Sequence, residues 1–271
     1  MDNTRFGFGS NWNNYIKNLD EKQIKEAKKS LKTYLATVDF ENKSFLDIGC
    51  GSGLFSLAAK RLGAKVHSVD YDINSVKCAQ KLKSKYYSDC NDWTIEQGDV
   101  LNDKYMSNLM IEGYDIVYSW GVLHHTGNMY KAIDNASKCV AKDGIFFISI
   151  YNDQGAISTM WKKIKKFYNN SPLFIKDILA FLYTIRIWGP IILKDLFEGR
   201  PFYSWKNYYK LRGMSPWIDI VDWVGGYPFE VAKPKEILDF CSQSQRGFKL
   251  IKMYTCGKGS ACNQFVFKKF S

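Results

Sequence analysis

The sequence contains no Cys-x-x-Cys pair, and its seven cysteines are scattered along 271 residues. A structural zinc site needs clustered cysteine and histidine ligands, and a disulfide framework is typical of short secreted chains with an even number of cysteines. We therefore expect free thiols in a reducing compartment and no metal site. The first residues lack the basic and then apolar segment of a signal peptide, so we expect a cytoplasmic location.

The sequence also lacks a long apolar run without charges. Its most apolar stretch, residues 172–193, contains Lys176, Asp177, Arg186 and Pro190, and these residues argue against a membrane-spanning helix. Three interpretations remain open for this stretch: a cap over an acceptor pocket, a dimer surface, or a helix in weak contact with a membrane surface. The choice between a monomer and a homodimer is open as well.

Acidic residues are the minority charge. Lys and Arg number 38 against 27 Asp and Glu, which gives a formal net charge of +11. This excess indicates either a solvated lysine-rich surface or attraction for an anionic partner such as a sugar nucleotide, a lipid headgroup or RNA. Because we find no RNA-binding motif, nucleic acid is not the expected partner.

Between residues 44 and 150, short apolar segments alternate with amphipathic ones. This alternation predicts βαβ units on a parallel sheet, in which ligands bind at the carboxyl ends of the strands. The expected strands are 44–49, 65–72, 93–100, 114–120 and 145–151, and the expected helices are 54–63, 73–87 and 129–144.

The flanking segments differ from this core in pattern. Residues 1–43 predict an arm and a helix, residues 151–231 a helical insertion rich in aromatic residues, and residues 232–271 a helix and a β-hairpin that completes the core sheet. The aromatic segment "FGFGSNW" of the arm has two open interpretations. It either folds over a bound cofactor or serves as a packing strap.

The first strand leads into a glycine-rich loop, "FLDIGCGSG" (Phe45 to Gly53). No lysine follows Gly53, so the loop is not the phosphate-binding loop of an ATPase, and its spacing G-x-G-x-G departs from the dinucleotide fingerprint. The carboxylate of Asp47 would repel a phosphate but attract an ammonium group. The loop therefore predicts a ligand without phosphate.

Two further acids follow the next two strands. Asp70 closes the second strand, where it can accept hydrogen bonds from a ribose diol. Asp99 closes the third strand, where it can accept from an adenine amino group while the amide of Val100 donates to the ring. A ligand with an ammonium group, a ribose and an adenine would use all three carboxylates, and S-adenosylmethionine fits this description.

Four motifs in order, "FLDIGCGSG", "VHSVDYD", "EQGDV" and "YDIVYSWGVLHHTGN", resemble the signature series of class I S-adenosylmethionine-dependent methyltransferases. The resemblance implies an α/β fold with a Rossmann-like, seven-stranded, mostly parallel sheet whose last strand is reversed. It also implies methyl transfer with S-adenosylhomocysteine as product. The cofactor contacts that it implies are Asp47, Gly49, Cys50, Gly51, Gly53, Asp70, Tyr71, Asp99, Val100 and Trp120.

A histidine pair follows the fourth strand at the ligand edge. A hydroxyl acceptor needs a base, and His125 matches the histidine of "LEH"-type motifs in ubiquinone-pathway O-methyltransferases, which this segment resembles. His124 is either a second site residue or a core histidine. Some of those enzymes hold a metal with carboxylates at the places of Gly121 and His124, and neither residue is acidic here.

The segment "RGMSPWIDIVDWVGGYPFEVA" is the second candidate for the acceptor site. It is either a structural corner or a polar pocket with apolar walls. In a pocket, Arg212 could bind a carboxylate or phosphate, and Asp219, Asp222 or Tyr227 could orient or deprotonate a hydroxyl.

The acceptor class is predicted from a second resemblance. The phrases "DWVGGYPFEVA" and "GSACNQFVF" resemble bacterial methyltransferases of surface-polysaccharide pathways. We therefore expect O-methylation of a small sugar or sugar-linked acceptor. RNA, a lipid or quinone-type acceptor, a nitrogen acceptor and a cofactor-binding module without catalysis remain as alternatives.

Overall fold

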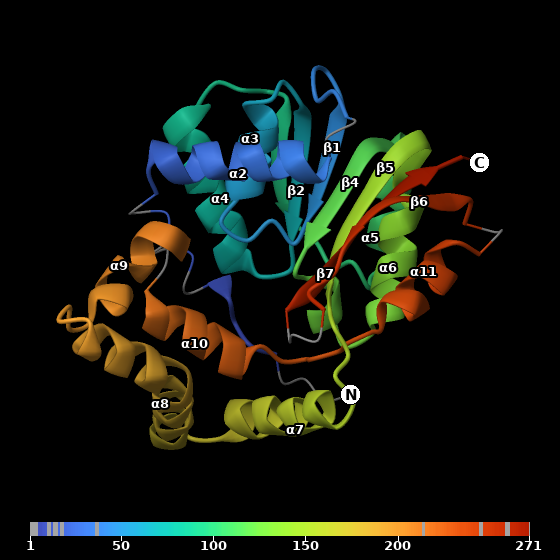
Figure 1. Cartoon of the computed structure of the whole chain (residues 1–271). Coiled ribbons are helices and arrows are strands. Elements are labelled where there is room, and N and C mark those ends of the chain that lie inside the picture. The colour runs from blue at the N-terminus through green and yellow to red at the C-terminus, as the bar shows by residue number, and fades with distance from the viewer. Residues whose placement is uncertain are drawn as a thin grey trace.

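The computed structural model describes residues 5–9, 12, 16, 19–35, 38–212, 215–243, 246–257 and 261–270, without the side chains of residues 112 and 209–212. Its centre is a seven-stranded sheet of order β3-β2-β1-β4-β5-β7-β6 (Figure 1). The strands β1 to β5 pair in parallel, and β7 runs antiparallel to both β5 and β6. The predicted fold, with its reversed last strand, is thus confirmed. The strands are β1 Ser44–Ile48, β2 Lys65–Asp70, β3 Trp93–Gln97, β4 Tyr114–Trp120, β5 Val140–Tyr151, β6 Phe248–Tyr254 and β7 Cys262–Lys269.

Helices cover both faces of the sheet. One face carries α2, α3 and α4, and the other carries α5, α6 and α11 (Figure 1). These helices are α2 Glu21–Tyr34, α3 Leu54–Lys60, α4 Ile73–Tyr86, α5 Asp103–Glu112, α6 Met129–Lys138 and α11 Pro234–Cys241. A short 3-10 turn, η1 (Leu123–His125), connects β4 to α6.

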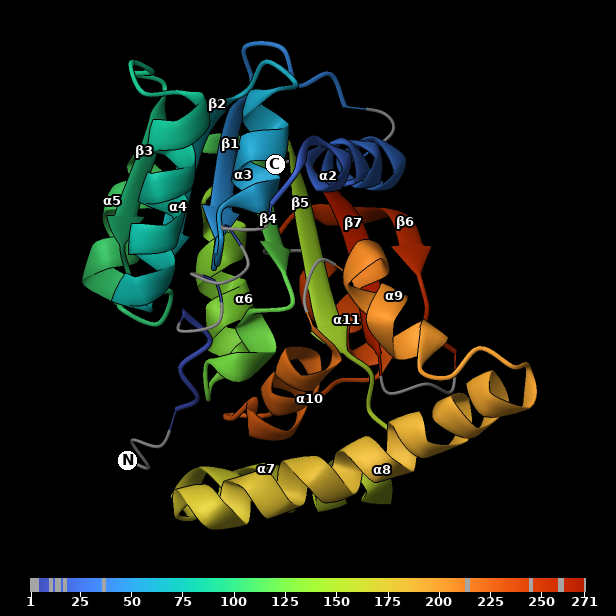
Figure 2. The same ribbon diagram turned by 90° about the vertical axis from the view of Figure 1, so that its left-hand side faces the viewer.

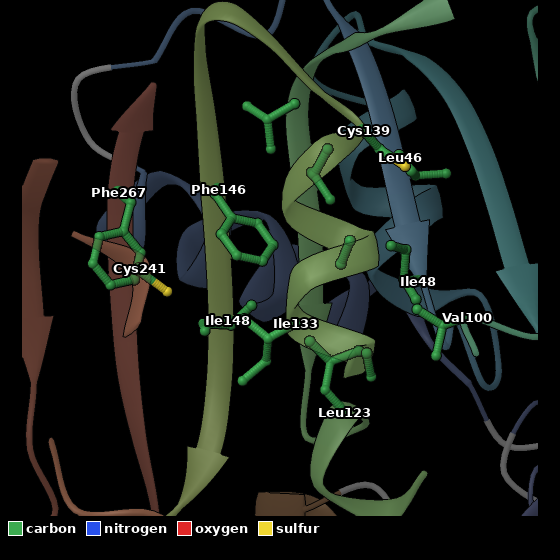
Figure 3. Close-up of a cluster of buried hydrophobic side chains, with 14 of the residues drawn as sticks. Leu46, Ile48, Val100, Leu123, Ile133, Cys139, Phe146, Ile148, Cys241 and Phe267 are labelled. Carbon is green, nitrogen blue, oxygen red and sulfur yellow. The ribbon is translucent and has the colours of Figure 1, made fainter. Parts of the chain in front are cut away.

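Side chains that alternate along the strands fill two apolar layers. In the layer beneath α6 and α11, Ile133 and Cys241 meet Phe146, Ile148 and other strand residues (Figure 3). Alternation of this kind places successive residues on opposite faces, so each central strand is buried on both sides. The rigid sheet that results fixes the carboxyl ends of β1 to β4 relative to one another.

Four helices form a layer beyond these carboxyl ends, and we call this layer the lid. They are α7 Ala156–Asn170, α8 Leu173–Phe197, α9 Tyr203–Arg212 and α10 Pro216–Gly225. Both views place α7, α8 and α10 beyond the end toward which the parallel strands run (Figures 1 and 2). The insertion is helical, as the sequence predicts, while the exact boundaries between units remain a prediction.

Several elements end two or three residues before the expected positions, as β3 does at Gln97 and α3 at Lys60, and two elements differ more strongly. The helix expected over 129–144 ends at Lys138, because Tyr114 N donates to Cys139 O and Val140 then pairs with Tyr114 in the sheet. Helix α5 was not assigned from the sequence, although Asn102 caps it by accepting a hydrogen bond from Tyr105 N. Its apolar residues Tyr105, Met106, Leu109 and Met110 follow a helical spacing and pack on the core, so this pattern could have indicated the helix.

All seven cysteines are free in the structure. Within the part of the chain that the structure describes, no helix combines the length and the apolar character needed to cross a bilayer.

Candidate active site

The glycine-rich loop between β1 and α3 packs closely beneath the segment that follows β4. Gly49, Gly51 and Gly53 have φ values of +78°, +54° and +80°, which favour glycine. A Cβ atom on Gly49 would lie 2.4 Å from the side chain of Val122. The loop therefore exposes backbone, without side chains, toward the edge of the sheet.

Asp70 fixes this loop to the end of β2. Its carboxylate accepts hydrogen bonds from Gly51 N at 2.9 Å and Asp72 N at 2.8 Å. Burial raises the pKa of Asp70 to about 6, so the group is still mostly ionised at pH 7. An ionised carboxylate of this orientation remains a strong acceptor for further donors.

Asp47 lies below the loop and is 3% exposed. A chain of donors points toward it: Trp93 Nε1 donates to Ser68 Oγ at 2.9 Å, Ser68 to Ser56 at 2.7 Å, and Ser56 to Asp47 Oδ2 at 2.5 Å. Burial raises the pKa of Asp47 to about 7, and the bond from Ser56 opposes this rise. The donor chain thus favours the carboxylate form.

Asp99 and Val100 follow β3 at the same edge. Asp99 Oδ1 accepts from Leu101 N at 2.9 Å, which shapes a tight turn. Val100 is buried, and its carbonyl accepts from Asn135 Nδ2 at 2.9 Å. Both residues are held by the core, so the turn is a rigid continuation of the strand.

The remaining predicted cofactor residues differ in exposure. Tyr71 is 53% exposed, and the guanidinium of Arg5 lies 4.3 Å from its ring centroid. Trp120 is 43% exposed and tilted against Phe55. Cys50 is buried, and burial raises the pKa of its thiol. Cys50 therefore packs under the loop as a neutral thiol.

These residues fit an adenosyl amino acid. The glycine loop carries three glycines with positive φ, and Asp70 and Asp99 place carboxylates at or just after the ends of neighbouring strands. Such a donor and acceptor set suits a ribose and an adenine better than a phosphate. The individual contacts with the cofactor stay predictions.

The N-terminal arm runs across this edge. Phe6 N donates to Tyr227 O at 2.9 Å, and Gly9 N donates to the carboxylate of Asp72 at 2.9 Å. The ring of Trp12 lies 3.2 Å from the position of a Cβ on Gly51. The arm therefore connects the lid with the glycine loop, a position that suits either interpretation given to it above.

His125 connects the core with the lid. Its Nδ1 lies 2.6 Å from Pro228 O, and because a carbonyl only accepts, Nδ1 carries the proton. Burial, together with the nearby charge of Lys165, lowers the pKa of His125 to about 3. The imidazole is therefore neutral at physiological pH, with the lone pair on Nε2.

His124 is completely buried and packs against Tyr151 at 4.1 Å between ring centroids. Tyr151 N donates to its Nδ1 at 3.4 Å, and burial lowers its pKa well below the usual value. Of the two interpretations of His124, the geometry favours the core histidine.

Tyr151 is a further candidate site residue that was not predicted from the sequence. It ends β5 and contacts the rings of His125, Trp223 and Phe229 at 5.3–5.5 Å. Burial raises its pKa well above the usual range, and the carboxylates of the lid add to this effect. Its place as the last residue of an apolar strand could have indicated it.

We call the contact region of His125, Tyr151, Trp223 and Phe229 between the core and the lid the junction. The acceptor segment predicted from the sequence is part of it, but the polar groups of this segment have other partners. Asp219 accepts a hydrogen bond from Tyr208 OH, and Tyr227 O accepts from the arm. Asp222 lies on α10, and its carboxylate influences the phenol of Tyr151. Arg212 ends α9, and its side chain lies outside the described part of the chain.

Glu230 belongs to the predicted acceptor segment, and in the structure it binds backbone groups of the core. Its carboxylate accepts from Met129 N at 3.0 Å at the start of α6, and its backbone N donates to His124 O at 2.9 Å. Glu230 therefore fixes the end of the lid to the core.

Lys165 is the most unexpected member of the junction. It is fully buried on α7, and its ammonium lies 4.3 Å from the ring centroid of Trp223 and 4.9 Å from that of Phe229. Within the described part of the chain its hydrogen-bond partner is Trp223 O, and no carboxylate pairs with it. Burial lowers its pKa to about 7. The spacing of Trp161, Lys165 and Tyr168 on one helical face could have indicated its burial.

Comparisons with known proteins find a family and several relatives. The profile of the family described as "Methyltransferase domain" matches residues 19–179. The ubiquinone biosynthesis O-methyltransferase of Pelagibacter ubique is 30% identical over 41% of this chain and 43% of its own length. The ribosomal protein L11 methyltransferase of Helicobacter hepaticus is 27% identical over 43% of this chain and 34% of its own length. The chain thus spans less than half the length of these curated relatives.

Among solved structures, the magnesium protoporphyrin IX methyltransferase of Synechocystis with bound SAH superposes with a TM-score of 0.52. The two sequences are 16% identical, and the match covers 93% of this chain and 86% of the Synechocystis chain. At this identity the likeness concerns the fold.

The substitution Asp70→Asn tests the cofactor edge. The amide loses the charged acceptor for the ribose, so we expect the Kd for S-adenosylmethionine, measured by calorimetry, to rise about 10-fold to 100-fold. Asp143→Asn is the control, because Asp143 is a surface residue with an ion-pair distance of 3.8 Å to Lys268. Equal affinity for both variants and the parent would contradict the ribose assignment.

The substitution Lys165→Met tests the buried cation. Folding lowers the pKa of this lysine, so the cost of burying its charge is fully present below pH 7 and declines as the pH rises toward 10. We expect the variant to be at least as stable as the parent at pH 7, since an apolar side chain removes that cost. The difference should shrink by at most about 1.4 kcal/mol per pH unit above pH 7.

Denaturant unfolding at pH 7, 8 and 9 measures this effect. Lys162→Met on the exposed side of α7 is the matched control and should show no such slope. A Lys165→Met variant that is strongly destabilised at every pH would show that the lysine is a net stabilising contact.

Proposed function

Because the chain belongs to the methyltransferase-domain family, we propose that it transfers a methyl group to an acidic hydroxyl, of the phenol, enol or quinol type, on a small acceptor. Its cofactor is S-adenosylmethionine, which supplies an electrophilic methyl group when bound. Asp47, Asp70 and Asp99 are the residues that we propose to hold it. The protein's remaining task is to orient the acceptor oxygen and take its proton.

The observation that carries this proposal is the state of His125. Its Nδ1–H is bound to Pro228 O, so Nε2 is the proton acceptor. A pKa of about 3 makes it a weak base that is always in its basic form. Proton transfer to a weak base is most favourable from an acidic hydroxyl, and a phenol, with a pKa of about 10 in tyrosine, is far more acidic than a sugar hydroxyl.

The surroundings of His125 support the same acceptor class. The rings of Phe8, Tyr151 and His124 lie 4.5–5.5 Å from its ring, and Trp223 and Phe229 continue this wall. Aromatic walls with few polar groups suit a flat apolar acceptor. Relatives named ubiquinone biosynthesis O-methyltransferase support this class. The family profile ends at residue 179, within α8, so it does not include the rest of the lid.

The sugar acceptor predicted from the sequence receives no support from these relatives. It remains a competing prediction, and one experiment separates the two. Labelled S-adenosylmethionine is incubated with phenols and quinols, with sugar nucleotides and glycans, and with total RNA. Label that enters only the sugars or only RNA would contradict the proposal.

The substitution His125→Gln tests the base. Glutamine keeps an N–H for Pro228 O but lacks a basic nitrogen, so we expect kcat for the best phenolic acceptor to fall about 100-fold or more. The affinity for S-adenosylmethionine should change little. The control is His67→Gln, since His67 lies on β2 and bonds Tyr114 OH at 2.7 Å.

The pH profile adds a second readout. The pKa of His125 is held near 3. The pH profile of kcat should therefore show no inflection near pH 6.5 that belongs to His125, so the profiles of the parent protein and of His125→Gln should not differ in this respect. Such an inflection would mean that His125 titrates as an ordinary histidine, and the weak-base argument would fail.

A further inference from the structure

The outer face of the lid is covered with large apolar side chains. In the described part of the chain, eleven of the exposed large apolar residues lie on the single helix α8. They are Leu173, Phe174, Ile178, Phe181, Leu182, Ile185, Ile187, Ile191, Leu193, Leu196 and Phe197. We call these residues the α8 face.

Packing of the lid does not explain this face. The side of α8 that meets the rest of the lid is a stripe with Ala180, Trp188 and Asp195, and Trp188 contacts the rings of Trp205 and Tyr208. The α8 face lies outside this stripe. Phe174 is 64% exposed, and Phe181 is 57% exposed. A water-exposed patch of this kind on one helix indicates an interaction surface.

The neighbouring helix α7 contributes positive charge to the same side of the molecule. Both views show α7 and α8 together at the edge farthest from the sheet (Figures 1 and 2). Lys162, Lys163 and Lys166 are exposed on α7. The residues Met160, Lys163 and Phe167 follow at intervals of three and four, so basic and apolar groups share one helical face.

Acidic groups are few on this side. On α8, Asp195 is buried and accepts hydrogen bonds from Ser204, while Glu198 just beyond the helix contacts Arg200. Asp177 is an exposed acid within the helix, and Arg186 is an exposed base. The charge of the α7 and α8 layer is therefore positive, which suits an anionic surface.

We propose that the α8 face docks on an anionic lipid bilayer, with its apolar side chains in the interfacial region and the lysines of α7 against the headgroups. Apolar burial and electrostatic attraction act together in such interfacial helices. The helix lies along the surface and does not cross the bilayer. The outer side of the lid then faces the lipid. The inner side of the lid faces the aromatic junction around His125.

Vesicle sedimentation with the full chain tests this proposal. We expect binding to vesicles of phosphatidylcholine and phosphatidylglycerol in equal parts, much weaker binding to phosphatidylcholine alone, and loss of the difference at high salt. Because the readout is partition and not methyl transfer, its outcome is independent of the proposed acceptor. Absence of binding to both kinds of vesicle would overturn the proposal.

Substitution of the apolar side chains gives the first variant. Phe181→Gln with Ile185→Gln should weaken partition about tenfold for each side chain removed. Ile111→Gln with Ile251→Gln, at exposed apolar positions elsewhere, is the matched control and should bind as the parent does. An unchanged unfolding midpoint and cofactor affinity show that each variant is folded.

Substitution of the lysines gives the second variant. Lys162→Gln, Lys163→Gln and Lys166→Gln together should weaken binding to the anionic vesicles on the order of 100-fold, about fivefold for each lysine. The exposed residues Lys249 and Lys252 on β6, changed to Gln, are the control. Equal losses per lysine in both sets would mean that net charge and not the α7 surface drives binding, and would overturn the docking assignment.

A second copy of the chain is the main competing occupant. If sedimentation equilibrium finds a dimer that Phe181→Gln with Ile185→Gln dissociates, and vesicles do not bind, the α8 face is a dimer surface and the proposal fails.

Discussion

The hydrogen bond from His125 Nδ1 to Pro228 O is the interaction on which the arrangement of the site depends. It joins the turn after β4, which belongs to the rigid sheet, to the segment that follows the lid helix α10. The bond also fixes the tautomer, because the carbonyl accepts only a proton-bearing nitrogen. This contact thus joins the lid to the core, together with the bonds of Glu230, and determines which nitrogen of the proposed base carries the proton.

Close approaches around this bond explain the sequence "GGYP". A Cβ on Gly225 would lie 2.3 Å from the ring of Phe6, and one on Gly226 would lie 3.1 Å from His125. Asn169 donates to Gly225 O at 2.6 Å, and Lys165 donates to the carbonyl of Trp223. The end of α10 is therefore held by polar groups from α7 that satisfy its last carbonyls. A buried lysine is a costly way to do so, because burial disfavours its charged form.

The glycine loop and the acids that we propose to hold the cofactor could be located from the sequence, because their signals are local. Glycines that need positive φ follow β1 directly, and Asp70 and Asp99 come at or just after the ends of β2 and β3, so each signal lies next to its own strand and all of them reach one edge of the sheet. The acceptor half depends on contacts between segments far apart, as between His125 and Pro228. The burial of Lys165 and the strand-end place of Tyr151 can be inferred from local patterns, but the contacts of both residues with Trp223 and Phe229 join segments that no single helical or strand pattern contains.

The two sides of the lid are subject to different constraints. Its inner side consists of aromatic rings around a neutral histidine and a partly neutralised lysine, so the junction favours acceptors that carry little charge of their own. Its outer side exposes aliphatic and aromatic residues that water alone would disfavour. A bilayer surface would resolve the second constraint and supply apolar acceptors for the first. The helix α8 then needs apolar residues both toward the lid and toward the bilayer. This need accounts for its high content of large apolar residues, which a helix with one side in water does not require.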